Sequence, residues 1–257
     1  MSDGRPELPT AYNLVHYEEV DELRGEARKL CEQGAEEGTL LWCDNQRNPL
    51  GRNGQPWIPG TGNLHCTVIL RPEFSPGRYP QLLLVAAVSM GNALAAHLTP
   101  MISLAYGCPD DIRIAGHKVA SIWIDCDPYD TEPWLCVTTS VNILSSPEDF
   151  SIPAISVIEA EGHTTLTAPA LLESFARQFI SLINLWSEPE GFDRITRLWL
   201  TRAETVGKTT SLQLDNEILT GKFEGLSSDG DLFIKPEDGP QTTVELSRLV
   251  NYAGSRP

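Results

Sequence analysis

The chain has 257 residues, of which 41% are hydrophobic and 21% charged, so it is long enough for one sizeable core or for a main domain with a small appendage. Its 19 basic and 35 acidic residues give a formal charge of -16 and a sequence pI of about 4.6. A nucleic-acid binder normally presents a basic face to phosphates. Because the sequence holds no basic run, nucleic acids and anionic membrane surfaces are poor candidate partners.

The six cysteines show neither a Cys-x-x-Cys motif nor the spacing of a zinc site, so we expect buried, reduced thiols and no structural metal. No basic segment followed by an apolar core opens the sequence, which predicts a cytoplasmic protein without a secretory signal. The longest apolar run covers 82–98 and contains Asn92 and His97. It is short for a membrane span and predicts a buried helix.

Taken in chain order, the stretch "YEEVDELRGEARKLCEQG" (17–34) predicts an amphipathic helix with acidic residues early and Gly34 after its end. A short apolar strand is expected over 39–43. The next twenty residues, 44–63, are dense in Gly, Pro and Asn. A connection of that length inside a compact domain indicates either function or disorder.

The middle of the chain alternates between strand and helix patterns. Two long helices combined with several consecutive strands are typical of an α+β protein, in which a sheet packs against helices. After the strand expected over 64–72 and the buried helix over 82–98, the predicted strands lie near 101–106, 111–115, 118–125 and 134–143, and the predicted helices cover 168–187 and 189–200.

From Thr209 onward the pattern changes to short strands and tight turns. Asp215-Asn216 is a two-residue hairpin signal, and "SSDGD" (227–231) is a second turn. About 50 such residues suit a small SH3-like β-barrel, whereas the alternative is a β-extension of the main sheet. We therefore divide the chain into a domain over 1–200 and a C-terminal domain over 201–257.

The glycine-rich loop contains Gly51, Gly54, Gly60 and Gly62, whose backbone N–H groups can surround an anion. Arg52 adds a fixed positive charge, and no carboxylate lies between Gln46 and Pro72. The loop is thus a locally favourable place for phosphate in an acidic chain. A plain surface loop with exposed arginines is the alternative.

The order of these segments resembles the biotin protein ligases, within the wider biotin/lipoate ligase family, over nearly the whole chain. That family carries a glycine-arginine loop ending in tryptophan, a Gly-Asn-Leu strand entry, a Lys-Trp-Pro-Asn-Asp motif, a lysine seven residues later and a Gly-x-Asn strand end. The matching positions here are Gly51, Arg52, Gly54, Trp57, Gly62-Asn63-Leu64, Pro109, Asp111, Lys118 and Asn142. The resemblance implies a class II synthetase-like mixed sheet flanked by helices, with an SH3-like barrel after it.

The chain also departs from the family pattern. The differing positions are Pro49-Leu50 and Asn53 in the loop, Gly107-Cys108 in place of Lys-Trp, Asp110 in place of Asn, Ser121 in place of Gly, and Glu22-Leu23-Arg24 in place of Ser-Thr-Asn. The last of these segments is implicated in holding the acid substrate. The scaffold is therefore retained while the acid pocket is altered, which leaves biotin specificity open.

The resemblance implies an ATP-dependent ligase that adenylates biotin, lipoate, octanoate or another acid and then acylates a carrier-protein lysine on a biotinyl or lipoyl domain. Two anions must meet in the first step, so positive groups and N–H donors must already be in place. The family assigns the bridging role to Lys118. Asp111 would hold the acid head or a Mg²⁺-bound water, and Asp110 is the second residue associated with Mg²⁺.

The remaining family positions would bind the adenylate. Arg52 closes over it with the amides of Gly51 and Gly54, and Trp57 stacks on the adenine. Asn142 fixes the phosphate or ribose, beside the Gly62-Asn63 strand entry. The alternatives are ordinary ones: Lys118 as a solvent-facing strand residue, Asp110 as a turn former, Trp57 as a core aromatic, Asn142 as a strand end, and His117 as a surface imidazole.

Two other functions stay open. The departures favour a catalytically silent relative that binds an acyl ligand, an acyl-adenylate or a carrier protein without turnover. An ATP-independent acyltransferase is the third possibility, against which Arg52 and Trp57 argue weakly. The sequence shows no N-terminal helix-turn-helix, so we expect a family member without the DNA-binding domain.

Overall fold

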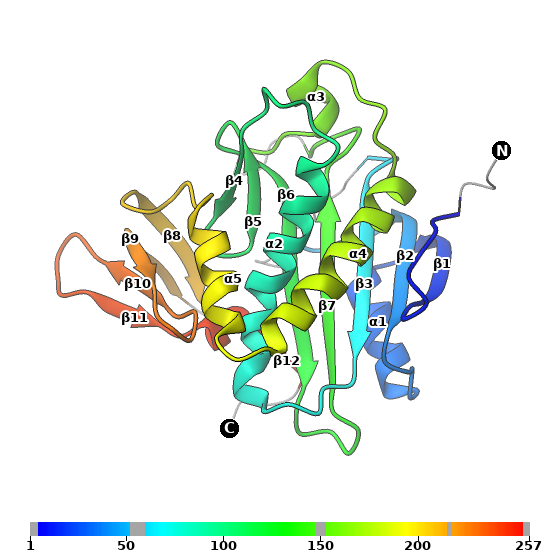
Figure 1. Cartoon of the computed structure of the whole chain (residues 1–257), viewed down its shortest axis with the longest axis horizontal. Helices are drawn as coiled ribbons and strands as arrows, with labels where there is room; N and C mark the ends of the chain where they lie inside the picture. The colour runs from blue at the N-terminus through cyan, green and yellow to red at the C-terminus, as the bar shows by residue number, and fades with distance from the viewer. Residues whose placement is uncertain (1–4, 52–59, 148–152, 215–216, 254–257) are drawn as a thin grey trace.

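The computed structural model describes residues 5–51, 60–147, 153–214 and 217–253, which form two sheets with helices packed on the larger one (Figure 1). The larger sheet has eight strands, ordered β1-β2-β3-β7-β6-β5-β4, with β12 beside β6. The pairs β1/β2 and β12/β6 are parallel and the others antiparallel. This confirms the predicted α+β class with a mixed sheet. The strands are β1 (Asn13–Val20), β2 (Thr39–Gln46), β3 (Leu64–Leu70), β4 (Leu104–Gly107), β5 (Asp111–Ile114), β6 (His117–Asp127), β7 (Trp134–Val141) and β12 (Asn251–Tyr252).

The helices lie on both faces of this sheet. Figure 1 shows α2, α4 and α5 in front of it and α1 behind it. Their bounds are α1 (Leu23–Glu32), α2 (Leu82–Ala95), α4 (Ala168–Ser187) and α5 (Gly191–Leu200), with the shorter α3 (Val157–Glu161) and the 3₁₀ helix η1 (Pro76–Gln81) in the connections. Among the described residues, no helix is both long and apolar enough to cross a membrane.

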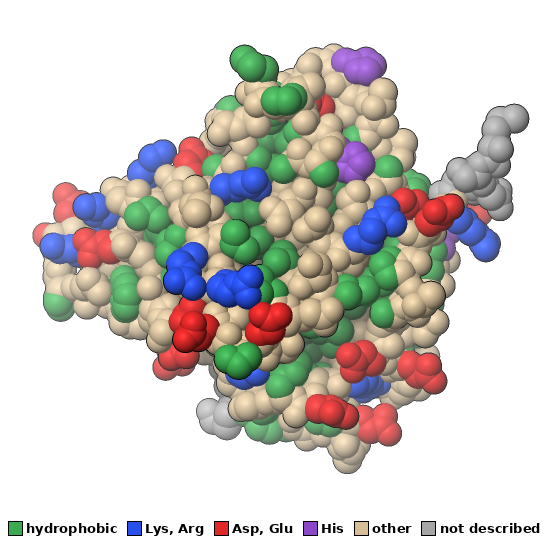
Figure 2. All heavy atoms as spheres, in the orientation of Figure 1, with side chains coloured by type: hydrophobic (Ala, Val, Ile, Leu, Met, Phe, Trp, Pro, Cys, Tyr) green, Lys and Arg blue, Asp and Glu red, His purple; other side chains and the backbone are tan. Residues whose placement is uncertain are grey.

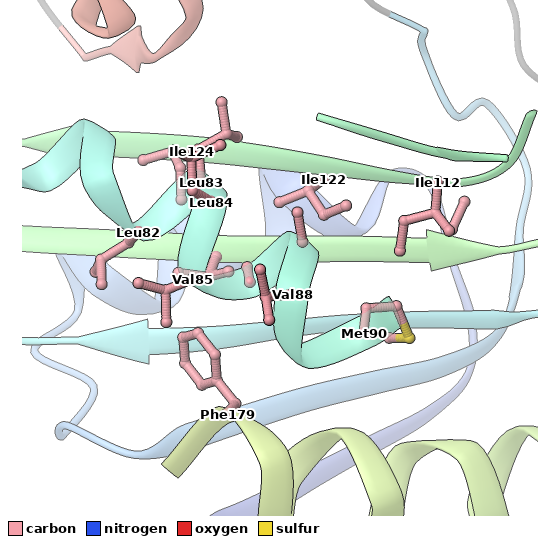
Figure 3. Packing of buried hydrophobic residues seen from close by; sticks show 14 of the residues in the cluster. Leu82, Leu83, Leu84, Val85, Val88, Met90, Ile112, Ile122, Ile124 and Phe179 are labelled. Carbon is pink, nitrogen blue, oxygen red and sulfur yellow. The ribbon is translucent and has the colours of Figure 1, made fainter. Parts of the chain in front are cut away.

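The main core forms around α2, which is buried on nearly all sides. Figure 3 shows Leu83 and Val88 of α2 near Ile122 and Ile124 of the sheet, with Phe179 of α4 on the other side. A helix that is apolar all round must be covered all round. The buried helix predicted over 82–98 is therefore confirmed. All six cysteines are unbridged and buried, as expected.

The helix predicted over 17–34 is wrong in its first part. Residues 17–20 end strand β1, and the helix begins only at Leu23. The strand lies at the edge of the sheet and is mostly polar, so its alternation of buried and exposed residues is weak. Gly34, with a φ of 80°, follows the helix as predicted.

The C-terminal segment forms a four-stranded antiparallel sheet in the order β11-β10-β9-β8. Its strands are β8 (Thr209–Leu214), β9 (Glu217–Leu226), β10 (Leu232–Lys235) and β11 (Thr242–Val244), and the 3₁₀ helix η2 (Leu246–Leu249) leads back to β12 in the large sheet. The predicted turn at Asp215-Asn216 lies outside the described residues. Closure into an SH3-like barrel stays a prediction.

The surface in Figure 2 mixes basic and acidic side chains over the helix-covered face. Exposed ion pairs such as Arg194 with Glu188 and Arg177 with Glu173 contribute to this mixture. Exposed pairs of this kind add little stability.

Candidate active site

A row of polar side chains crosses the sheet on the face opposite α2. His65 of β3 is paired with Ser140 of β7. Ser140 is paired in turn with Ser121 of β6, and Ser121 with Asp111 of β5. Successive strand residues point to opposite faces, and the alternating residue Ile122 lies in the core under α2. The row therefore faces the side of the sheet on which α1 packs.

Lys118 reaches the same face because of a β-bulge. Asp111 and Ile112 pair with Ser121 and Ala120, but the next pair is Arg113 with Lys118, so Val119 is an extra residue in β6. Without that residue, Lys118 would alternate with Ala120 and point into the core. The bulge thus turns the lysine toward Asp111.

Lys118 and Asp111 form a close, mostly buried ion pair. The distance from Nζ to Oδ1 is 2.7 Å, and the two side chains are 14% and 10% exposed. Arg113 Nη2 lies 3.5 Å from Oδ2 of the same carboxylate. An ammonium held in this way is positioned before a substrate arrives, which favours the binding of an anion. The ion pair brings together two residues that the family motif places seven positions apart; the predicted role of Asp111 at the acid head or at a Mg²⁺-bound water stays a prediction.

Asp110 lies in the turn between β4 and β5, where its carbonyl accepts the N–H of Ile122 at 2.9 Å. Both oxygens of Asp111 face cations, so this carboxylate does not fit a direct Mg²⁺ ligand. Within the described ranges, no three His, Cys, Asp or Glu side chains gather closely enough to hold a metal ion. The described residues therefore offer no direct set of protein ligands for Mg²⁺.

Asn142 and Asn63 both organise backbone. Asn142 donates from Nδ2 to the carbonyls of Lys118 at 3.5 Å and Ile155 at 3.3 Å, which ties the end of β7 to β6. Asn63 is 1% exposed, and its Oδ1 accepts the N–H groups of residues 143, 144 and 145 at 2.8, 3.0 and 3.3 Å. Its Nδ2 donates to the Ser145 carbonyl at 3.0 Å. The Asn63 side chain thus holds the turn that follows β7.

Replacing Asn63 with alanine should lower the free energy of unfolding by about 2 kcal/mol, because several buried backbone groups lose their partner. Urea denaturation measures this loss. Asn184 is exposed on α4, and Asn184→Ala is the matched control. A loss of less than 0.5 kcal/mol (about one tenth of a typical folding stability) would contradict the structural role of Asn63.

The remaining predicted site residues lie in and around the glycine-rich loop, of which the structure describes only a part. Gly62 has a φ of 84°, and a side chain there would collide with Leu144, so the turn needs glycine. Gly51 is partly buried at the start of the loop. Arg52, Gly54 and Trp57 lie outside the described residues. His117 is exposed, and its Nδ1 lies 3.0 Å from the carbonyl oxygen of Ala115. This agrees with a surface imidazole.

Arg24 is a site residue that sequence reasoning did not assign. Its guanidinium makes two contacts of 2.8 Å with the buried carboxylate of Asp125, and its centre lies 5.8 Å from the ring of Trp123. Asp125 is two residues beyond Trp123 and so on the same face of β6. The altered 22–24 segment therefore belongs to this end of the site. No local signal in the sequence links residues a hundred positions apart.

Two cavities meet at Arg24 and Trp123. The first has about 20 Å³, and its lining residues are Glu22, Arg24, Gln46, Pro49, Leu50, Trp123, Thr138 and Ser140. The second, of about 200 Å³, is lined by Arg24, Trp123, Gln213, Arg248, Leu249, Val250 and Asn251. Ser140 connects the first cavity to the row that ends at Asp111.

Comparisons with known proteins agree with this geometry. The sequence profile described as the biotin/lipoate A/B protein ligase family matches residues 57–201. The biotin–[acetyl-CoA-carboxylase] ligase of Paracoccus denitrificans is 29% identical over 235 residues, which are 86% of this chain and 94% of that protein. The bifunctional ligase/repressor BirA of Bacillus subtilis is 25% identical over 236 residues, 88% of this chain and 70% of that protein.

Solved structures show the same fold. A biotin protein ligase-like protein of unknown function from Silicibacter has a TM-score of 0.75 and 24% identity, covering 95% of this chain and 99% of its own. The biotin protein ligase of Aquifex aeolicus in complex with biotin and ATP has a TM-score of 0.74 and 24% identity, covering 91% and 95%.

The sheet and the helices around it therefore have the fold of the biotin protein ligases. Because the matched profile covers more than half of the sequence, the chain belongs to the biotin/lipoate A/B protein ligase family and is a ligase-like enzyme.

Proposed function

We propose that the protein is an ATP-dependent ligase that adenylates a biotin-like carboxylic acid and transfers the acyl group to a lysine of a carrier protein. The observation that carries this proposal is the buried contact of 2.7 Å between Lys118 and Asp111 on the polar face of the sheet. The names of the relatives support it, since one is a biotin–[acetyl-CoA-carboxylase] ligase and another binds biotin and ATP.

In the first step, a carboxylate oxygen of the acid attacks the α-phosphorus of ATP and pyrophosphate leaves. Lys118 lies between the two anions, where its charge offsets their repulsion and the charge that develops at phosphorus. The lysine has three N–H donors. Asp111 holds it in place, and Arg113 adds positive charge beside it.

In the second step, the neutral amine of the carrier lysine attacks the acyl carbonyl and AMP leaves. The same Lys118 ammonium stabilises the carbonyl oxygen as it becomes negative. In this proposal Arg52, with the Gly51 and Gly54 amides, covers the adenylate and keeps water away from the mixed anhydride. Trp57 stacks on the adenine, Asn142 keeps the Lys118 strand in register, and Mg²⁺ enters with the phosphates of ATP. Residues 1–200 supply this chemistry, and 201–257 form the accessory SH3-like domain.

The test is ATP–pyrophosphate exchange with biotin, lipoate and octanoate, each with Mg²⁺. We expect exchange with biotin, followed by transfer to a biotinyl carrier domain. The catalytically silent alternative is favoured by one observation, the cavity of only about 20 Å³ between Pro49 and Trp123. Steady exchange with any acid would exclude that alternative, whereas no exchange with all three would overturn the ligase proposal.

A further inference from the structure

Several buried nitrogen atoms have no hydrogen-bond partner among the described residues, and two of them belong to rings that neighbour Ser140 and Thr138 on the polar face. These two are Nε2 of His65 and Nε1 of Trp123. A buried polar group without a partner carries a free-energy cost, so such groups are rare and need an explanation. Most of their polar neighbours on this face are satisfied: Thr67 and Thr138, for example, share a hydroxyl contact of 2.8 Å.

Trp123 lines the smaller cavity, and His65 lies one strand away from the lining residue Ser140. His65 is the cross-strand partner of Ser140, and Trp123 is the partner of Thr138 on the opposite side of β7. Ser140 and Thr138 both line the cavity, as does Trp123 itself. Two strand spacings and one step of two residues place the Cα atoms of His65 and Trp123 about 12 Å apart. The space over β7 is about 20 Å³ with Pro49 and Leu50 in place, so a ring-sized group fits between the two side chains only if these residues move.

The imidazole of His65, whose Nε2 has no described partner, is uncharged. Its ring is 1% exposed, and its Nδ1 lies 3.0 Å from the hydroxyl of Ser140. Burial lowers the pKa of His65 to about 4, so the ring is uncharged at neutral pH. Indole, in turn, can only donate. The pair therefore suits an uncharged group with a carbonyl acceptor and does not suit a hydrocarbon chain.

We propose that His65 and Trp123 are specificity-determining residues that bind the neutral polar head of the acid, an amide or a cyclic urea, over Thr138 and Ser140. The acid runs across the sheet from its carboxylate at Lys118, which lies about 14 Å from His65 by two strand spacings and a three-residue offset along β6. It displaces the Pro49–Leu50 cover of the cavity, and an aliphatic acid leaves both nitrogens unpaired. This inference rests on the proposed function.

The experiment measures KM and kcat for pyrophosphate exchange with biotin and with octanoate as the two probes. Trp123→Phe removes the N–H together with part of the indole ring, and His65→Asn keeps a group at the Nδ1 position but none at Nε2. Each change should raise the KM for biotin three- to tenfold, the effect of one neutral hydrogen bond. The kcat with biotin and the KM for octanoate should stay within about twofold, which is below that effect. His65→Gln, which places an amide at the Nε2 position, should restore the biotin KM.

Trp134→Phe is the matched control, because Trp134 Nε1 is also buried without a described partner but lies in the core under α1. Its KM for biotin should equal that of the wild type. A purely structural role for Trp123 predicts that Trp123→Phe lowers the melting temperature and leaves the biotin KM unchanged, whereas a role in binding the acid raises that KM. An unchanged biotin KM in both site variants would overturn the inference.

Calorimetry with biotin separates this inference from the proposed function. If the wild type binds biotin but shows no exchange, the ligase proposal fails, and the Kd values of the same variants test the two residues. If the wild type neither binds biotin nor shows exchange, both are overturned.

Discussion

Lys118→Ala is expected to lower kcat for acyl-adenylate formation about a thousandfold, while the protein stays folded. Loss of a single preorganised donor to a developing charge costs about a hundred- to a thousandfold. Lys118 faces two anions at once, which places it at the upper end of that range. Pyrophosphate exchange with a saturating acid measures the effect, and single-turnover acyl transfer measures the second step separately.

The fold should tolerate this change, since Arg113 remains 3.5 Å from Asp111 and compensates part of its charge. Lys29→Ala is the matched control, because Lys29 lies on α1 and is 67% exposed. It should retain full activity. Wild-type exchange rates in Lys118→Ala would refute the assignment of Lys118, and a large fall in its melting temperature would make the ion pair structural instead.

The sequence predicted the elements whose patterns are strongest. The helix over 82–98 is apolar on all sides and the helix over 168–187 is long and periodic, and both are present. Strand β1 was missed because its residues are held by backbone pairing with β2 and little by burial of side chains. The two-residue strand β12 was missed for a related reason, since only its pairing with β6 defines it.

The site was predictable where spacing carries the chemistry. The resemblance to the family, which carries a lysine seven residues after its last Asp, implied that Asp111 and Lys118 belong to one site, and their Oδ1 and Nζ atoms are 2.7 Å apart. The bulge at Val119, which turns the lysine to the correct face, has no signal in the strand pattern. The role of Asn63 in holding the 143–145 turn and the contact of Arg24 with Asp125 depend on residues distant in sequence, so no local pattern could show them.

The contact between Arg24 and Asp125 leads to the largest expected change in stability. Asp125→Ala should lower the free energy of unfolding by about 3–5 kcal/mol, because it leaves the guanidinium of Arg24 largely buried and without its partner. The Asp125 side chain is 2% exposed, and that of Arg24 is 19% exposed. Arg28 also reaches Asp125, at 3.3 Å, but it is 43% exposed and can turn to water. Urea denaturation gives the measurement.

The double variant Arg24→Met with Asp125→Leu should recover most of that loss, because a buried ion pair can be replaced by apolar side chains at small cost. A double variant as unstable as Asp125→Ala would contradict the dominant role of the unpaired charge. Arg24 also lies over Trp123 between the two cavities. The double variant should therefore be stable but have a changed KM for the acid. This outcome separates the stabilising role of the ion pair from its position in the acid site.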